Sequence, residues 1–430
     1  MQQSTIALII MLVTIILFAT EKLPLAVVAI FSALAMAIFG CISYSDALAG
    51  FSNTATLMVI GLCIIGEAFF TTGLADDISH MFLRMKNLTE GKFIVVAALV
   101  STLLSCFLVG MIVLAIFLPV IDALASKTNG VITRKNTYLP VAIGAVFGGN
   151  LSSIGSSSMI NASGQLAASY YGRPLNFFEP FPLAAASCGV FILVLILVTK
   201  KFQHKFFDFE EPPMHAEPEQ IAVHTDERQE SKKAPVWKKW FTLLTLVACV
   251  VSFIVGANFG AFSMLGAFIL IAFGCIDIKH AMRNLSWETV FVVVGTLGFA
   301  KGVSDSGAGR VIAETLLKIC GPMSGNAFFM CVLMLFLATL ISNFMANNAT
   351  VGILVPIALS IAQVLGASPV VFVLACGIGA NLSVMTPICT STITITASCG
   401  YRFRDYVKYG GLFNVLAFAA TAVAMKLCYF

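Results

Sequence analysis

The longest uncharged stretch of the chain runs from Ile319 to Tyr401 and contains no Asp, Glu, Lys, Arg or His. Across the whole chain, 59% of residues are hydrophobic and only 11% are charged, whereas a soluble globular protein carries about 25% charged residues. A membrane-spanning helix needs about 20 apolar residues, so this stretch alone is long enough for several. We therefore expect an all-α integral membrane protein, and a water-soluble fold is excluded.

Apolar segments separated by polar loops mark the expected spans. They are Ser4–Thr20, Leu23–Gly40, Thr54–Leu74, Phe93–Ile121, Thr137–Tyr170 and Phe181–Thr199, then Trp240–Gly256, Gly260–Cys275, Thr289–Ala300, Ile319–Tyr401 and Tyr409–Met425. Between the two sets lies the polar stretch Lys200–Lys239, whose composition is typical of a disordered or loosely folded linker. The predicted domains are a first membrane repeat at 1–199, a linker at 200–239 and a second membrane repeat at 240–430.

Two apolar segments share a pattern. Thr102–Pro119 and Thr339–Pro356 align at a constant offset without gaps, with Thr, Leu, Ser, Phe, Ile and Pro at matching places. Each is interrupted by small or polar residues, Val109-Gly110-Met111 in the first and Ala346-Asn347-Asn348 in the second. Because Phe93–Ile121 is too long for one span and too short for two, we predict a re-entrant hairpin with its tip at Gly110. The repeat predicts a second hairpin near Asn326–Gly366.

Each predicted hairpin is followed by a segment that contains helix-breaking residues. Thr137–Tyr170 holds a run rich in Gly and Ser, and Pro369–Gly400 holds Thr386-Pro387. The tripeptide Asn-Leu-Ser occurs in both segments. Broken helices at membrane depth persist only where protein or a water-filled cavity covers them. Duplicated breaks of this kind indicate the binding site of a transporter.

Each half then has five transmembrane helices, one of them broken, plus one re-entrant hairpin. Because five is odd, the second repeat must be inverted relative to the first, and the basic residues provide an independent test. With the N-terminus outside, the inside loops hold Lys22, Arg84, Lys86, Lys92, Lys127, Arg134, Lys135, the linker, Lys279, Arg283, Arg402, Arg404 and Lys408, and the outside loops hold mainly Arg173, Arg310 and Lys318. We therefore expect a multi-pass protein of the plasma (inner) membrane, with a cytoplasmic linker and both termini outside.

The hairpin tips and broken helices bring amides, hydroxyls and free backbone groups into a region of low dielectric. Half-helix N-termini can hold an anion, and half-helix C-termini and unwound carbonyls can hold Na⁺. These segments contain no Arg or Lys, so a small anionic substrate would depend on helix ends, Asn and Ser/Thr donors and co-bound cations. The predicted substrate-binding residues are Asn150, Ser152, Ser156, Ser157, Ser158, Asn347, Asn348, Thr350, Thr386, Pro387, Thr390, Ser391 and Thr392. The candidate Na⁺ ligands are Ser105, Gly110, Asn150, Gly155, Ser342, Asn347 and Asn381.

A structural explanation competes with each of these assignments. Small and hydroxylated residues also let membrane helices pack closely, and we prefer that explanation for scattered residues such as Ser101 and Ser187. For the duplicated runs Ser152–Ser158 and Thr390–Thr394 we prefer a functional role. Glu67 lies in an apolar span and has Lys301 as its counterpart in the second half. An intramembrane ionisable residue is a functional candidate, but a structural partner is the preferred explanation here.

Other function classes find no support. The motifs HExxH, Walker A and GxSxG do not occur, and the five His lie in loops or the linker. The 12 cysteines are scattered and mostly within apolar runs, as expected for small buried hydrophobic residues. The net charge is only +4, with the basic residues in loops. We expect neither an enzyme nor a nucleic-acid-binding protein.

Three stretches resemble the divalent-anion/sodium symporter family (solute carrier family 13 type), within the wider ion-transporter superfamily. They are Leu139–Asn161, Thr386-Pro387, and Tyr401–Tyr406 followed by Gly410. The resemblance covers nearly the whole chain. It implies homodimers with a scaffold and a moving transport domain, elevator-type alternating access, and Na⁺-driven uptake of dicarboxylates, citrate or sulfate.

The chain departs from this family at the hairpin tips. The family carries Ser-Asn-Thr at both tips, where this sequence has Val109-Gly110-Met111 and Ala346-Asn347-Asn348. Met159 and Ile393 stand where the family has an Asn. The carboxylate-binding pattern is thus largely absent from the first half and partial in the second. Two alternatives stay open beside a Na⁺-coupled symporter: an arsenite or weak-acid exporter of the same superfamily, and a channel-like or transport-impaired relative.

Overall fold

The structure is a computed structural model that describes residues 2–20, 22–83, 89–128, 131–201, 206–207, 209, 211 and 235–430. All regular secondary structure in these ranges is helical. The elements of the first half are α1 (Gln3–Thr20), α2 (Leu25–Ile38), α3 (Tyr44–Leu48), η1 (Ala49–Ser52), α4 (Thr54–Thr71), α5 (Leu74–Leu83), α6 (Glu90–Ser105), α7 (Gly110–Lys127), α8 (Arg134–Gly148), α9 (Ser157–Ala168) and α10 (Phe181–Lys201).

The second half contains the same kinds of element. They are α13 (Val236–Ile254), α14 (Phe259–Ala272), α15 (Ile278–Arg283), α16 (Trp287–Asp305), α17 (Ala308–Cys320), η3 (Gly321–Met323), α18 (Ala327–Ser342), α19 (Asn347–Leu365), α20 (Pro369–Leu382), α21 (Ser391–Thr394), η4 (Ile395–Cys399), α22 (Phe403–Asp405), η5 (Tyr406–Gly410) and α23 (Gly411–Tyr429). Most of the predicted linker lies outside the described residues, although 200–201, 206–207, 209, 211 and 235–239 are described. Its end, from Val236 to Lys239, forms the first turn of α13.

Seven helical spans in the described ranges are long and apolar enough to cross a membrane, or eight if a bent pair formed by α17 and α18 is counted. Three further apolar helices, α2, α14 and α20, have 14 residues each. Large apolar side chains such as Leu12, Phe31 and Leu197 are at least half exposed on these helices. Such outward-facing apolar surface suits contact with lipid, which confirms the expected all-α membrane fold.

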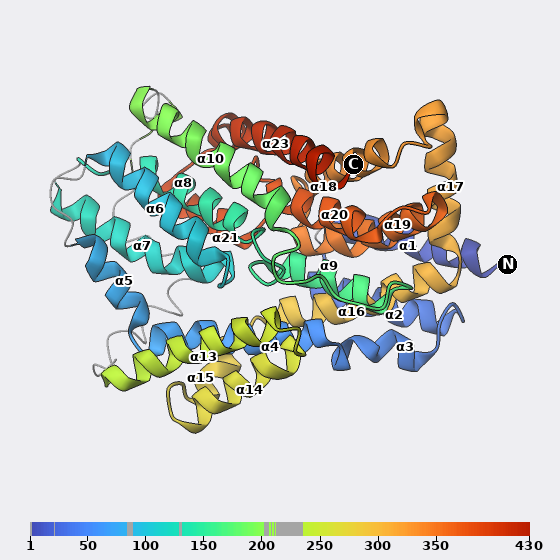
Figure 1. Ribbon diagram of the computed structural model, residues 1–430, viewed down its shortest axis with the longest axis horizontal. Helices are drawn as coiled ribbons and strands as arrows, with labels where there is room; N and C mark the ends of the chain where they lie inside the picture. Colours follow the sequence, from blue (N-terminus) through green and yellow to red (C-terminus); the bar gives the residue numbers. More distant parts are fainter. Residues whose placement is uncertain are drawn as a thin grey trace.

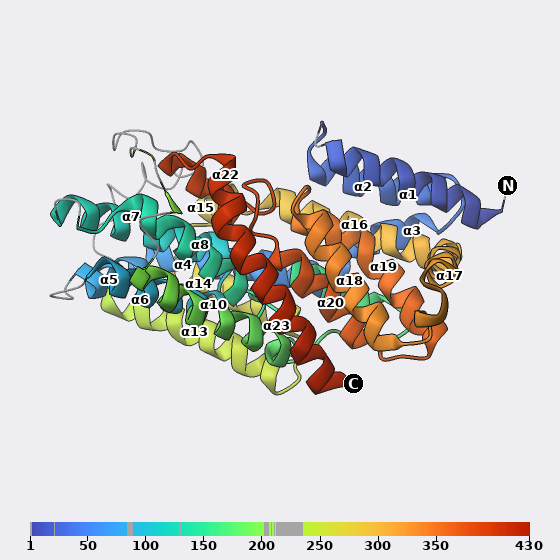
Figure 2. The ribbon, with the colours of Figure 1, turned by 90° about the horizontal axis from the view of Figure 1, so that it is seen from above.

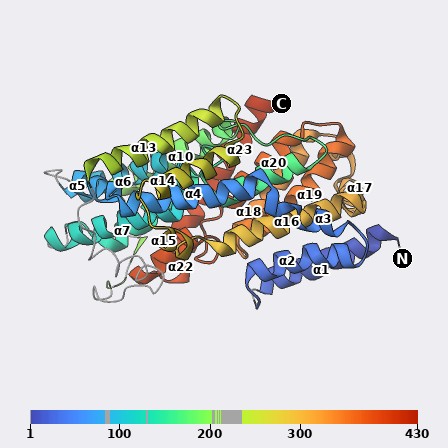
Figure 3. The same cartoon turned by 90° about the horizontal axis from the view of Figure 1, so that it is seen from below.

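The helices of the two halves pack in exchanged pairs. Helix α2 packs against α16, α4 packs against α14, and α10 packs against α23. Within the halves, α6 packs on α8 as α18 packs on α20. Figure 3 shows α4 beside α13 and α14, and Figure 2 shows α1 and α2 together at one edge of the molecule. Such an exchange is what a two-fold relation between two repeats would produce.

Glycines allow the hairpins to approach the broken helices closely. A Cβ atom on Gly148 would collide with the carbonyl group of Thr102, and one on Gly379 would lie 2.8 Å from the carbonyl oxygen of Leu335. Gly148 and Gly379 each stand two positions before the Asn of an Asn-Leu-Ser tripeptide, so they are equivalent in the two halves. Small residues at helix crossings let two backbones meet in a membrane, so these positions hold each hairpin against the break that follows it.

The long axis of the molecule has two distinct ends. The N-terminus, α3 and α17 lie at one end, and α5 lies at the other (Figure 1). The longer helices run roughly along this axis. Lys22, between α1 and α2, and the first turn of α16 therefore lie away from the N-terminus, while the last turn of α16 leads into α17 at the N-terminal end.

Candidate functional site

Both hairpins turn at the predicted tips. Helix α6 ends at Ser105 and α7 begins at Gly110, while α18 ends at Ser342 and α19 begins at Asn347. The two starting residues, Gly110 and Asn347, occupy the same position of the aligned sequence repeat. Both second helices continue through an internal proline, Pro119 in α7 and Pro356 in α19, rather than ending there.

Each tip is tied to the broken helix of its own half. The Ser152 hydroxyl donates to the carbonyl oxygen of Cys106 at 2.6 Å, and the Thr386 hydroxyl donates to that of Asn343 at 2.6 Å. Cys106 and Asn343 also occupy matching positions of the aligned repeat. Hydroxyls in the breaks thus satisfy carbonyl groups that the ends of the hairpin helices leave free.

A cavity of about 720 Å³ lies where the two tips and the two breaks meet. Gly110 and Asn347, the first residues of α7 and α19, line it together with residues from both breaks. The 12-residue half-helix α9 begins at its wall with Ser157, and the four-residue turn α21 begins there with Ser391. The free N–H groups and partial positive charge at the start of α9 make this wall suited to an anion.

Asn381, at the end of α20, is the centre of the polar network in this cavity. Its amide bonds to the Asn150 side chain at 2.6 Å and to the Asn347 side chain at 2.8 Å. The hydroxyls of Ser156 and Ser158 lie 2.8 and 2.7 Å from the same amide. Asn150 and Asn381 are the first residues of the two Asn-Leu-Ser repeats, so equivalent positions of the two halves bond to each other.

The side chain of Asn347 faces a group of oxygen atoms. With its amide turned so that nitrogen faces them, the amide donates to the Ser342 hydroxyl at 2.6 Å and to the Cys389 carbonyl oxygen at 2.7 Å. The Ala380 carbonyl oxygen and the Ser383 hydroxyl lie 3.2 and 3.3 Å away. Hydroxyl and carbonyl oxygens of this kind can coordinate Na⁺. In this orientation, however, the Asn347 nitrogen occupies the place between them, so the oxygens of Ser342 and Cys389, and not the Asn347 side chain, are the candidate Na⁺ ligands.

Backbone oxygens gather in the same way at the first tip. A Cβ atom on Gly155 would collide with the carbonyl oxygen of Ser105 and would lie 2.7 Å from that of Gly149. The Ser105 hydroxyl donates to the Leu108 carbonyl at 3.3 Å, and the side chain of Asn150 is fully buried nearby in the sequence. The carbonyl groups of Ser105 and Gly149 thus approach Gly155 at a contact that leaves no room for a side chain.

The structure places part of the predicted set at the cavity. The predicted residues that line it are Gly110, Gly155, Ser156, Ser157, Ser158, Asn347, Asn348, Asn381, Thr390, Ser391 and Thr392. The predicted residues outside its lining are Ser105, Asn150, Ser152, Ser342, Thr350, Thr386 and Pro387. Of these, Asn150 and Ser342 bond to Asn381 and Asn347, so they support the lining residues.

Thr350 and Pro387 have local bonding partners instead of facing the cavity. The Thr350 hydroxyl donates to the Ala346 carbonyl of its own helix at 3.3 Å, and the Pro387 carbonyl accepts from the Thr394 hydroxyl at 2.6 Å. Their local sequence resembles that of the lining residues, so the pattern alone could not distinguish the two groups.

Two charged residues at the cavity were not predicted. Lys22, between α1 and α2, and Glu288, in the first turn of α16, both line it. Both come from outside the hairpins and broken helices, which explains why a search of those segments missed them. Glu67 is also placed by the structure: its carboxylate lies 2.9 Å from the His280 ring and accepts from Asn284 at 3.2 Å. That contact favours the structural role that the sequence suggested for Glu67.

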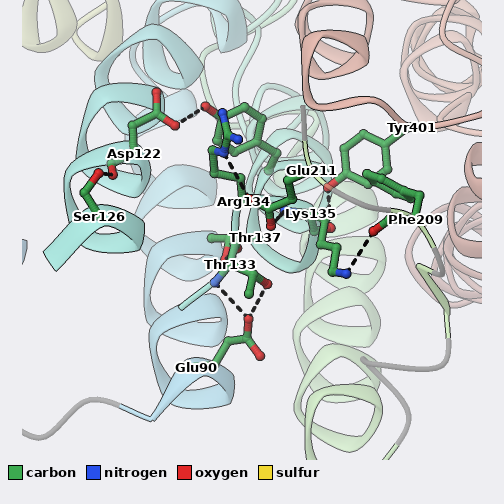
Figure 4. Close-up of polar contacts among 11 residues, drawn as sticks. Glu90, Asp122, Ser126, Thr133, Arg134, Lys135, Thr137, Phe209, Glu211 and Tyr401 are labelled. Carbon is green, nitrogen blue, oxygen red and sulfur yellow. Dashed lines mark hydrogen bonds and ion pairs between the residues drawn. The ribbon is translucent and has the colours of Figure 1, made fainter. Parts of the chain in front are cut away.

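The first broken helix is anchored at its start by two carboxylates. Glu90 accepts from the Thr133 backbone N–H at 3.0 Å, and Glu211 accepts from that of Lys135 at 3.1 Å (Figure 4). The Tyr401 hydroxyl donates to the Lys135 carbonyl at 2.5 Å. Negative charge at a helix N-terminus is favourable. Tyr401, from the closing segment, therefore ties the second broken helix to the start of the first.

Comparisons with known proteins agree with this geometry. The family model described as a citrate transporter (CitMHS) matches residues 15–377. Two relatives match 95% of the chain at 22% identity: an uncharacterized transporter of Haemophilus influenzae, 88% of which is covered, and the sodium-dependent high-affinity dicarboxylate transporter 3 of Caenorhabditis elegans, 80% of which is covered. Solute carrier family 13 member 2 of Oryctolagus cuniculus is 26% identical over 35% of the chain and 25% of its own length.

Other relatives match only in part. The uncharacterized transporters YfbS of Escherichia coli and sll0640 of Synechocystis are 28% and 31% identical, and the matches cover 36% and 39% of this chain. The chain spans only about a quarter of the length of these two relatives, 26% and 27%.

Two solved structures share the fold. They are the YdaH transporter of Alcanivorax borkumensis, with a TM-score of 0.56 over 89% of this chain and 87% of that one, and MtrF of Neisseria gonorrhoeae, with a TM-score of 0.57 over 98% and 95%. Both are 12% identical to this chain, so the likeness concerns the fold. The family match across most of the chain and the solute carrier family 13 relatives confirm the resemblance to that group, whose relatives are named as transporters and not as enzymes. The chain belongs to the citrate transporter family.

Proposed function

We propose that this protein is a secondary active transporter that takes up a small (di)carboxylate or inorganic divalent anion together with Na⁺. The observation that carries the proposal is the cavity between the hairpin tips and the broken helices. The N-terminus of the half-helix α9, at Ser157, and the turn that begins at Ser391 meet there beside the amides of Asn347 and Asn381. These groups donate hydrogen bonds and carry partial positive charge, which suits an anion.

The need for a co-bound cation follows from the charge of the lining. Lys22 is the one basic residue among the described lining residues, and Glu288 opposes its charge. A dianion in such a place meets a large desolvation cost that helix ends and hydroxyls offset only in part. The Ser342 hydroxyl and the Cys389 carbonyl on one side, and the carbonyls of Ser105 and Gly149 on the other, would hold Na⁺. The bound ions would supply the missing positive charge.

The names of the relatives also favour Na⁺-coupled transport of an anion. One relative that matches along most of its length is named as a sodium-dependent dicarboxylate transporter, and the matching family is named for citrate. The tips of this chain lack the Ser-Asn-Thr of the symporter family, so the substrate is proposed as a class rather than as one compound. Export of arsenite or another weak acid, and a channel-like or transport-impaired relative, are the alternatives that the test below separates.

We infer that the chain has two inverted repeats, at 1–199 and 240–430. The exchanged packing of α2 with α16 and of α4 with α14 supports this inference. Alternating access of the elevator type would then move the hairpins and broken helices against a scaffold that contains α2, α4, α14 and α16. The homodimer rests on the family resemblance alone and stays a prediction.

Uptake of radiolabelled citrate and succinate by proteoliposomes tests the proposal. An inward Na⁺ gradient is compared with an equal choline gradient, and Na⁺ uptake is measured in parallel with radioactive sodium. We expect uptake of at least one anion that requires Na⁺ and that carries Na⁺ with it. Uptake that is equal in choline would contradict symport and favour the exporter or channel alternatives, and no uptake of either anion would contradict the proposed substrate class.

A further inference from the structure

A second cavity of about 300 Å³ lies at the other end of the same three helices that line the main cavity. Helix α9 contributes Ser157 to the main cavity and Gln165 to the second, and α16 contributes Glu288 to the main cavity and Lys301 to the second. Helix α19 does the same with Asn348 and Ser360. All three helices pack against one another (Figure 1). The two cavities are therefore the two ends of one seam between α9, α16 and α19.

A chain of buried polar side chains connects the two cavities along this seam. The Asn161 amide donates to the Asn348 carbonyl at 3.4 Å, and its oxygen accepts from the Thr296 hydroxyl at 3.0 Å and from the Gln165 amide at 3.2 Å. Asn161 is fully buried, and Thr296 and Gln165 are at most 2% exposed. Burying polar groups is costly unless they are hydrogen-bonded, and these side chains bond to one another in an unbroken series from Asn348 to Gln165.

The seam is closed between the cavities in this state. A Cβ atom on Gly352 of α19 would collide with the Thr296 methyl group of α16, so the two helices are in direct contact there. The side-chain oxygen of Gln165 is buried and has no hydrogen-bond partner among the described residues, although Gln165 lines the second cavity. Gln165 thus places a polar side chain at the point where this chain of hydrogen bonds meets the second cavity.

The second cavity carries the basic residue that the hairpins and breaks lack. The Lys301 ammonium lies 3.2 Å from the Asp305 carboxylate, and the two side chains are 38% and 42% exposed. Half-exposed pairs of this kind hold their partners weakly, so Lys301 is available to another carboxylate. Ser360 of α19 also lines this cavity, and its hydroxyl donates to the Pro356 carbonyl of its own helix at 2.9 Å.

We propose that this second cavity is an access site for the transported anion on the N-terminal side of the membrane, with Lys301 binding one of its carboxylates. The inference rests on the proposed anion transport and adds a second place at which the anion binds. In the state described here, the main cavity would exchange substrate with the opposite side. Sliding of α9 and α19 along α16, past the contact at Thr296 and Asn161, would join the second cavity to the transport path.

Transport kinetics measured separately from each side of the membrane test the proposed role of Lys301. In vesicles sorted by an N-terminal tag, Lys301→Gln should raise KM for citrate or succinate supplied from the N-terminal side by about fivefold, the upper range for losing one ion pair at a partly exposed site. KM from the opposite side should stay unchanged, because Lys22, rather than Lys301, lines the cavity that faces that side. Lys301→Arg should stay within about twofold of wild type, because it keeps the charge.

Two further variants separate a ligand-binding role from a structural one. Asp305→Asn breaks the same ion pair but keeps the ammonium group, so it should lower KM from the N-terminal side rather than raise it. Lys318→Gln removes an exposed basic residue of α17 that does not line the cavity and should leave KM unchanged. The inference would be overturned if Lys301→Gln had the same KM as wild type. It would also be overturned if KM rose to a similar extent in Lys318→Gln, or if Lys301→Gln raised KM equally from both sides. Each of these results would leave the proposed function intact. A wild type that transports neither anion would contradict the proposed function and this inference with it.

Discussion

At the scale of single residues, the proposed binding site relies on side-chain amides more than on charged side chains. Asn381 joins the two halves through Asn150 and the hydroxyls of Ser156 and Ser158, and it also bonds to Asn347 of its own half. A side-chain amide has both donors and acceptors, so a pair of them can bond in either direction. The site can therefore present oxygen atoms to a cation or N–H groups to an anion without any titratable group.

An alanine substitution removes a hydrogen-bonding side chain at the second hairpin tip but not at the first. Asn347→Ala deletes an amide that faces Ser342, Asn381 and the Cys389 carbonyl, all within 2.8 Å. Loss of a buried hydrogen-bonding group costs about 1–3 kcal/mol, or roughly 5- to 150-fold in affinity. We expect Asn347→Ala to weaken Na⁺ or substrate binding by such a factor in a binding titration of the purified protein.

Gly110→Ala is the comparison at the other tip. Its new Cβ would lie 3.3 Å from the Ala145 carbonyl oxygen and from the Thr392 hydroxyl, so a small shift accommodates it and no ligand is lost. Ser187→Ala, which removes a buried hydroxyl bonded to its own helix, controls for general destabilisation. Wild-type Na⁺ dependence in Asn347→Ala, or a larger loss of affinity in a stably folded Gly110→Ala, would contradict the assignment.

At the scale of elements, the sequence repeat located both hairpins and both breaks. Helix α7 begins at Gly110 and α19 at Asn347, within the predicted tips, because the apolar pattern and the interrupting residues are local. The sequence did not reveal the contact between Asn161 and Thr296, because the two residues lie far apart along the chain. It did not reveal Lys22 at the main cavity either, because that position depends on how α1 and α2 pack beside α16.

The orientation of the helices is a separate prediction. The basic loops place the linker 200–239 and Lys22 in the cytoplasm and both termini outside, because Lys and Arg near spans are retained inside. Reporter fusions or cysteine labelling at residues 22, 173 and 220 should show positions 22 and 220 on the cytoplasmic side and position 173 outside. Labelling of position 220 from outside would contradict the inverted arrangement of the repeats.

At the scale of the whole molecule, one interface links both cavities. The main cavity is at the end of the seam where α9, α16 and α19 begin, and the smaller cavity is where they end. Between them the helices touch through Gly352 and Thr296, and a single chain of amides and hydroxyls crosses the contact. A protein with cavities at both ends of a closed seam can expose a site to one side at a time, as alternating access requires.

The central claim is that the anion is held in the main cavity together with Na⁺. Its most direct test is calorimetric titration of the purified protein with citrate and succinate at low and high Na⁺, with choline holding the ionic strength constant. Because binding free energies are linked, saturating Na⁺ should tighten the anion, and the anion should tighten Na⁺ by the same factor. An anion that binds with the same affinity in Na⁺ and in choline would contradict the account.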